Sequence, residues 1–177
     1  MRTPSMFADR TLRLFYWNAD PRVLDADLMQ LEKLLKRLGD IKLTSIKSLD
    51  LIPKDGCDLL IIAAHSIPKK EFPKWLMGLR ARIHSNGRIW VPALILADVG
   101  FEVLADILTD VTAENWYFDI LLPSHVESLP IRVANLLRIH DHLHELNRYE
   151  LAIAEVSNRV KDLESELQKL RKLSQTT

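Results

Sequence analysis

The segment from Asp58 to Ala64 is apolar throughout after its first residue and has the sequence Asp-Leu-Leu-Ile-Ile-Ala-Ala. A strand with one face in water alternates apolar and polar residues, so an unbroken apolar run of this length is typical of a strand covered on both faces. Such strands lie in the middle of parallel sheets, because the helices that connect parallel strands pack on both sides. This segment therefore predicts a domain of the α/β class.

Short β-prone runs and stretches of helical spacing alternate on either side of this segment. The predicted strands are residues 11–17, 41–46, 58–64, 88–96 and 116–122, and the predicted helices are residues 21–38, 73–84 and 100–108. The first helix has Asp20 as its N-cap, Pro21 at its first position and Gly39 at its C-terminal cap. Residues 48–55 predict a turn or a single helical turn, and residues 1–10 a loose arm. We expect a doubly wound, five-stranded parallel sheet with helices on both faces.

From about Glu127 the sequence predicts one long helix, with no glycine or proline after Pro130. Two series of residues, three places apart, recur every seven positions, which is the pattern of a coiled coil. The two series are Ile139, Leu146, Ile153, Val160 and Leu167, and His142, Tyr149, Val156, Leu163 and Leu170. We expect these residues, called the heptad seam below, to form a dimer interface.

β-branched residues in the first series and leucine late in the second favour a parallel pair of helices. His142 would then face its own copy in the partner chain. A helix that folds back on its own domain is the alternative, but a globular surface would not require a strict seven-residue period. The predicted organisation is an arm (1–10), an α/β domain (11–131) and a coiled-coil helix (132–177).

The chain has 24 Lys and Arg residues against 24 Asp and Glu residues. Nucleic-acid-binding domains usually carry a basic excess, so direct binding of nucleic acid is not expected. The charges are unevenly placed, because residues 69–88 hold six basic residues and one acid, whereas residues 98–127 hold seven acids and no Lys or Arg. The acidic region predicts a surface for a basic protein partner. Its candidate contact residues are Asp98, Glu102, Asp106, Asp110 and Asp119.

The sequence offers little that could carry catalysis. His65 and Ser66 are adjacent in the chain, which does not aim one side chain at the other. His140 and His144 share a helical face at a metal-ligand spacing, but no third ligand accompanies them. The five glycines are scattered, so no phosphate-binding loop is present. We expect no enzymatic activity, no cofactor and no metal.

The lone Cys57 is expected to be a buried packing residue. No apolar run approaches the roughly 18 residues of a membrane span, and the N-terminus has no apolar export segment. The expectation is a cytoplasmic protein that does not enter a membrane.

The order of elements over residues 11–138 resembles the receiver domain of bacterial response regulators, which has a CheY/flavodoxin-like fold. The resemblance rests on topology, on strand spacing and on the Leu122-Pro123 junction. In that family, a last helix that runs into a coiled coil is a common means of dimerisation. The resemblance implies a role in two-component signal transduction.

A phosphorylatable receiver has a carboxylate nucleophile after its third strand, an acidic pair after the first to hold Mg²⁺, a hydroxyl after the fourth and a lysine after the fifth. The matching positions here are Asn18, Ala19 and the nearby Asp20, Ala63 or Ala64, Ala97, and Leu122. Because alanine cannot accept a phosphoryl group, the resemblance implies a pseudo-receiver that has kept the fold and lost phosphotransfer. An unrelated doubly wound domain that never held such a site is the alternative.

The expected function is that of a non-catalytic, atypical response regulator that acts through protein contacts as a homodimer, with another signalling or ligand-sensing protein as its partner. The layout is also similar to the front part of antitermination regulators of the ANTAR type, in which an RNA-binding helical bundle follows the coil. That bundle has no counterpart before Thr177. Under this alternative, the chain is the regulatory part of a transcription regulator whose output domain lies beyond these residues.

Overall fold

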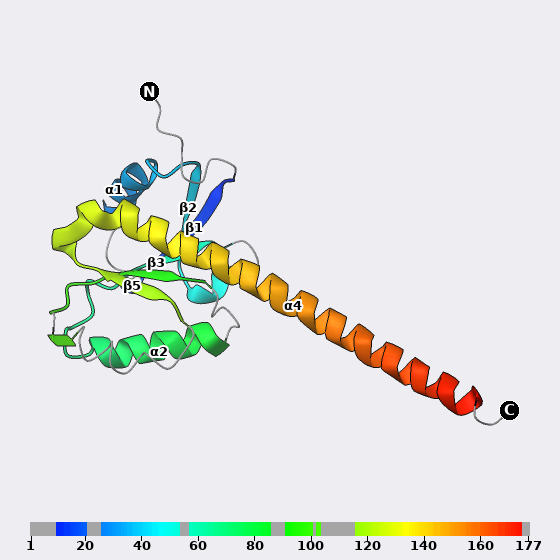
Figure 1. Ribbon diagram of the computed structural model, residues 1–177. Coiled ribbons are helices and arrows are strands. Elements are labelled where there is room, and N and C mark those ends of the chain that lie inside the picture. The colour runs from blue at the N-terminus through cyan, green and yellow to red at the C-terminus, as the bar shows by residue number, and fades with distance from the viewer. Residues whose placement is uncertain are drawn as a thin grey trace. The chain divides into compact units, whose positions relative to one another are not determined.

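The computed structural model describes residues 10–20, 26–53, 57–85, 91–100, 102–103 and 116–174. Five strands form one sheet (Figure 1): β1 (Leu12–Asn18), β2 (Ile41–Ile46), β3 (Leu59–Ala63), β4 (Ala93–Leu96) and β5 (Phe118–Leu121). Three α-helices, α1 (Ala26–Leu35), α2 (Phe72–Ser85) and α4 (Leu129–Ser174), and two 3₁₀ helices, η1 (Leu49–Leu51) and η2 (Pro123–Ser128), accompany them. The chain divides into two compact units, Met1–His140 and Asp141–Thr177.

All neighbouring strands of the sheet run parallel, in the order β2-β1-β3-β4-β5. The predicted five-stranded parallel sheet is therefore confirmed. This order reverses between β1 and β3 and is one of the two common orders of doubly wound sheets. It places β3 at the centre, where its unbroken apolar sequence predicts it to lie.

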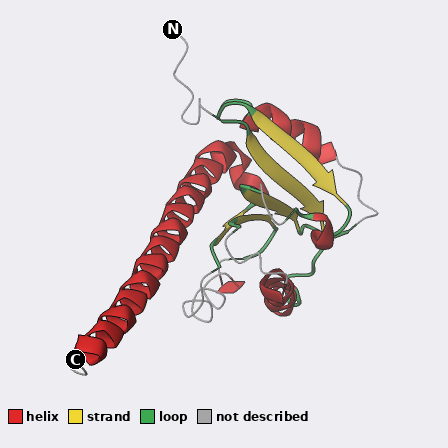
Figure 2. Ribbon diagram, turned by 90° about the vertical axis from the view of Figure 1, so that its right-hand side faces the viewer, coloured by secondary structure: helices red, strands yellow, loops and turns green. Residues whose placement is uncertain are grey.

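The central strand is covered from both faces, because no residue of β3 is more than 3% exposed. On one face, Leu60 and Ile62 pack with α2 residues such as Phe72 and Leu76. On the other face, Leu59 and Ile61 pack with residues of α1 and of the first turns of α4. Figure 2 shows the strands lying between α1 and α2. Helices on both faces confirm the α/β class.

Asp58, the one polar residue of the central run, has a local structural role. Its side chain is largely buried, and its Oδ2 accepts a hydrogen bond from the backbone N–H of Arg13 at 2.7 Å. Its own N–H donates to the Arg13 carbonyl at 2.9 Å. Because a buried carboxylate is costly unless it is hydrogen-bonded, this exchange explains why an acid can precede β3.

Several predicted elements appear with changed limits. Among the described residues β4 begins at Ala93, because Pro92 has no N–H to donate to a neighbouring strand, and residues 88–90 of the predicted strand lie outside the described part. α1 ends at Leu35, and Gly39 adopts a φ of 145° in the link to β2 rather than capping the helix directly. Three predicted parts lie outside the described residues: the N-terminal arm to residue 9, the expected beginning of the first helix at residues 21–25, and residues 101 and 104–108 of the helix predicted at 100–108.

The predicted turn at residues 48–55 is confirmed by η1, which Ser48 caps with its side chain. The helix predicted at residues 73–84 is confirmed by α2. Cys57 is buried among the side chains that pack under α2, as expected.

The long C-terminal helix is confirmed as α4, which has 46 residues and carries Pro130 in its first turn, where a missing N–H costs nothing. Its first three turns pack on the sheet through Leu129, Val133, Leu136 and Leu137, none more than 4% exposed. The first compact unit consequently extends to His140, past residue 131. The first turns of α4 are a part of the sheet unit, and we call Leu129–His140 the root of α4.

The root of α4 provides a direct test of this packing. Truncating Leu137, which is fully buried, to alanine leaves a cavity against the sheet and should lower the free energy of unfolding by about 3 kcal/mol. Ile131, two turns earlier and 64% exposed, is the matched control, and Ile131→Ala should change stability by less than about 0.5 kcal/mol. Urea unfolding followed by circular dichroism measures both. Equal effects of the two variants would contradict the packing of the root.

Candidate functional site

The carboxyl ends of the inner strands form one row across the sheet. Asn18 pairs with Ala63, Ala63 with Leu96, and Leu96 with Leu121. Residues that follow these strands consequently meet at one edge, where doubly wound sheets bind their ligands. The structure therefore brings together the four segments that the receiver resemblance matches to the positions of a phosphorylation site.

The residues at the positions matched to the phosphorylation site are mostly apolar. Ala64 and Ala97 are buried and Leu122 is half-buried in the core under α2, and Ala63 is buried in the core on the other face of the sheet. Asn18 turns its Oδ1 back to accept the backbone N–H of Asp20 at 2.9 Å, which closes the end of β1. None of these side chains except Asp20 is ionisable.

Other polar groups lie just beyond the row. His65 and Ser66 are exposed after β3, and the exposed Lys69 forms an ion pair of 3.6 Å with Asp98, which follows β4. Within the described part of the chain, no group of three His, Cys, Asp or Glu residues could hold a metal ion. His140 and His144, the pair with metal-ligand spacing, both lie on α4.

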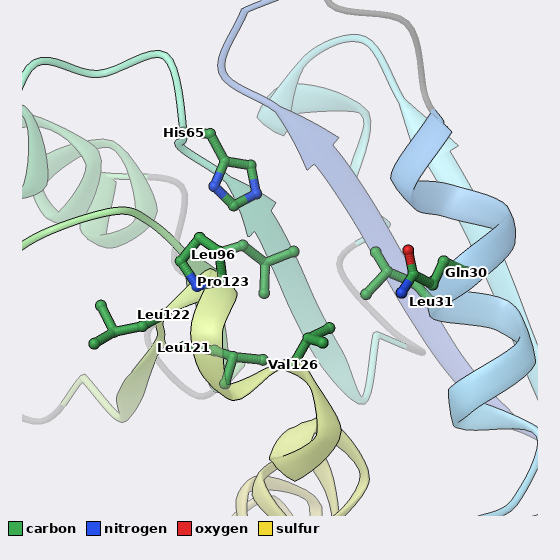
Figure 3. Close-up of a pocket in the computed structure, with 8 residues that line it drawn as sticks. All are labelled: Gln30, Leu31, His65, Leu96, Leu121, Leu122, Pro123 and Val126. Atoms are coloured by element: carbon green, nitrogen blue, oxygen red, sulfur yellow. The ribbon is translucent and has the colours of Figure 1, made fainter.

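A pocket of about 210 Å³ opens at this edge between α1 and η2 (Figure 3). Its floor consists of the buried side chains of Leu31, Leu96 and Leu121. The remaining lining residues are Gln30, His65, Leu122, Pro123 and Val126. The pocket cannot be anticipated from the sequence, because its walls come from four separate segments of the chain. The apolar ends of β4 and β5 are the only sequence signal of it.

The residues of the predicted acidic partner surface have different surroundings. Asp98 and Glu102 are exposed, whereas Asp106 and Asp110 lie outside the described residues. Asp119 is engaged within the chain, because Arg132 Nη1 donates to both of its carboxylate oxygens at 2.7 Å. Each of these two side chains is 35% exposed.

Arg132 fixes the beginning of α4 to β5 through a small network. Its Nε donates to Ser128 Oγ at 3.1 Å, and the Ser128 hydroxyl donates to the carbonyl of His125 at 2.7 Å. His125 has a non-helical backbone conformation within η2, so the chain bends just before α4. The network joins the bend, the strand and the helix. In the sequence, the one available hint is an arginine in the first turn of a helix that follows a strand containing an acid.

The heptad seam runs along α4 with its side chains exposed. From Leu146 to Leu167 the large apolar seam residues are between 47% and 68% exposed, and His142 is exposed. Ile139, at the beginning of the seam, packs partly against the core of the sheet unit. Leu170 lies within the helix, and its side chain is outside the described part. Exposed apolar stripes of this extent on a helix are typical of interaction surfaces.

Comparison of the sequence with protein-family profiles finds no match, and comparison with curated proteins finds none either. Among the described residues, no helix combines the length and the apolar character that crossing a membrane requires.

The ion pair between Asp119 and Arg132 can be measured by a double-mutant cycle. Asp119→Asn and Arg132→Met should each lower the free energy of unfolding, and the double variant should lose less than the sum. We expect a coupling of about 1 kcal/mol, because the pair is charge-assisted but partly exposed to water. The pair Asp50 and Arg82, which is 3.5 Å apart and more exposed, is the control and should couple more weakly. Additive single effects at Asp119 and Arg132 would contradict the bond.

Proposed function

We propose that this chain is a phosphorylation-independent regulatory protein, a pseudo-receiver that acts through protein contacts as a parallel coiled-coil homodimer. The observation that carries this proposal is the composition of the carboxyl edge. In this sheet, which has the order β2-β1-β3-β4-β5, the carboxyl edge has Ala63, Ala97 and Leu122. The receiver resemblance matches these positions to the residues that carry out phosphotransfer in receivers.

The alanine at the end of β3 supports the loss of phosphotransfer. An acyl phosphate forms when a carboxylate oxygen attacks the phosphorus of a donor, and the methyl group of Ala63 has no such oxygen. Asp20 alone offers a single carboxylate to a Mg²⁺ ion, which usually takes one or two carboxylates together with phosphate oxygens. A regulator with this edge would have to respond to something other than aspartyl phosphate.

The exposure of the seam supports dimerisation. Burial of one large aliphatic side chain contributes about 1.5–3 kcal/mol relative to leaving it in water, and six such seam residues, together with Tyr149, are exposed between Leu146 and Leu167 in the single chain. A second copy of the same helix matches their seven-residue period along its whole length.

The charges beside the seam support the parallel arrangement. In a parallel pair, Arg159 of one helix meets Glu164 of the other, and Glu166 meets Arg171, whereas Glu145 meets Glu150. Two attractive pairs outnumber one repulsive pair. A parallel dimer would place both sheet units at one end of the coil, so that a partner bound to the sheet units could alter the coil.

The acidic surface is the proposed contact for a basic protein partner. Asp98 and Glu102 are its exposed members among the described residues. Asp119 contributes less, because Arg132 already neutralises its carboxylate. The partner's identity is not part of the proposal, but its contact surface should carry Lys or Arg.

Phosphotransfer is tested with a small phosphodonor and Mg²⁺, and an ordinary receiver serves as the positive control in the same reaction. We expect the receiver to gain an acid-labile phosphoryl group and this chain to gain none, because no carboxylate lies at the end of β3. Intact-protein mass spectrometry reads the result. An acid-labile adduct on Asp20 or on any other residue of this chain would overturn the phosphorylation-independent mechanism.

Dimerisation is tested by placing charges in the seam. The double variant Val160→Lys/Leu163→Lys should be monomeric, because two lysines per helix would face their copies in the interface. Its matched control, Asn158→Lys/Ser165→Lys, adds the same charges on the outer face of the coil and should remain dimeric. Light scattering coupled to size-exclusion chromatography gives the mass. A wild-type monomer at ~50 μM, or two variants of equal mass, would contradict a dimer through the seam.

The orientation of the helices is tested by cross-linking. In a parallel dimer, Leu167→Cys brings two thiols together across the interface, and mild oxidation should give a disulfide-linked dimer. Ser165→Cys, on the outer face two residues away, is the control and should link far more slowly. Non-reducing electrophoresis measures both. An antiparallel pair would separate the two copies of residue 167, so equal slow rates would exclude the parallel arrangement.

A further inference from the structure

The geometry points to a ligand site in the pocket between α1 and η2, where a small, neutral aromatic molecule with one hydrogen-bonding group would bind. This inference stands on the pocket of the sheet unit and does not require the coiled coil. It assigns a chemical input to an edge of the sheet at which β3 ends in Ala63 and not in a carboxylate.

The volume and the lining of the pocket indicate the size and the apolar character of the ligand. Its volume of about 210 Å³ exceeds the ~150 Å³ at which an apolar protein cavity already holds benzene. Leu31, Leu96 and Leu121 form the floor and are no more than 6% exposed, so a ring seated on them would leave water. A single substituted ring fits these limits, whereas a nucleotide would be too large and too polar.

The polar side chains at the rim of the pocket indicate that the ligand has a neutral hydrogen-bonding group. Figure 3 shows Gln30 on α1 and His65 after β3 on opposite sides of the leucine floor. Both side chains are exposed, and the amide of Gln30 and the ring nitrogens of His65 can donate or accept a hydrogen bond. No Asp, Glu, Lys or Arg is among the described residues that line the pocket. A charged ligand would therefore lose its hydration without gaining an opposite charge.

The position of the pocket connects it to the beginning of α4. Pro123 and Val126 of η2 form part of the wall, and Leu129, three residues after Val126, begins α4. The bend at His125 and the network from Arg132 to Asp119 lie in the same segment. A ligand seated against η2 would restrain this segment, so binding at the carboxyl edge would reach the root of α4 directly.

The experiment uses the full chain and two probes of matched shape, 4-methylbenzyl alcohol and 4-methylbenzoate. Ligand-observed NMR and calorimetry measure the dissociation constants. We expect saturable binding of the alcohol with a Kd of about 1 mM or tighter, and binding of the carboxylate weaker by about tenfold or more. Amide hydrogen exchange should slow in η2 and at residues 30–31 when the alcohol is bound, and should not change in α2.

Variants locate the binding site. Val126→Phe places a ring into the pocket from η2 and should weaken binding of the alcohol by about tenfold. Ile131→Phe adds the same ring at an exposed position outside the pocket and should leave the Kd unchanged. On α1, Gln30→Ala should weaken binding severalfold, whereas Glu32→Ala, at an exposed position that does not line the pocket, should not.

Three outcomes would overturn the inference: no saturable binding of the alcohol, equal affinity for the alcohol and the carboxylate, or an unchanged Kd in Val126→Phe. Binding of a tryptophan-containing peptide with no binding of the free alcohol would also overturn it, in favour of a protein side chain as the occupant. These results are independent of the cross-linking and mass measurements, so failure here and failure of the proposed dimer are distinguishable.

Discussion

Every side chain of β3 is buried, which requires an apolar cover on both faces of the sheet. α2 supplies one cover, and α1 with the root of α4 supplies the other. The position at which the long helix begins is therefore set by the core of the sheet unit and not by the coil. The bend at His125 and the bond between Arg132 and Asp119 follow from the same requirement, because the chain must turn sharply after β5 to bring Leu129 onto the sheet.

The sequence predicts the fold well where one residue pattern decides one element. β2 has its predicted limits, and β3 lies at the centre of the sheet because an unbroken apolar run is stable only there. The predicted beginning of the fourth strand is less accurate, because Pro92 has no N–H for the strand ladder and β4 begins after it, at Ala93. The predicted site positions do meet at one edge, because parallel strands end together. The pocket and the engagement of Asp119 could not be predicted, since each depends on side chains from segments far apart in the chain.

The two proposals share one physical basis. A carboxyl edge of alanine and leucine has no carboxylate for phosphotransfer, but Leu96, Leu121 and Leu122 at the same edge provide apolar lining for a pocket. On this view, removal of the acidic groups would change the kind of input that the edge accepts, from a charged phosphoryl group held by Mg²⁺ to a neutral molecule held by burial. The connection from this edge to the long helix would be unchanged, because η2 and the root of α4 follow β5 in either case.

The buried residues at the root of α4 and the residues of the heptad seam follow different registers of one helix. Seven residues before Ile139 and His142 stand Arg132 and Asn135, which are half-buried and exposed, whereas Leu129, Val133, Leu136 and Leu137 are buried. The seam from Leu146 onward thus shares no residue with the core of the sheet unit. Substitutions in the seam could therefore change the partner of the coil from a second copy to a related chain. The core of the sheet unit would keep all of its residues.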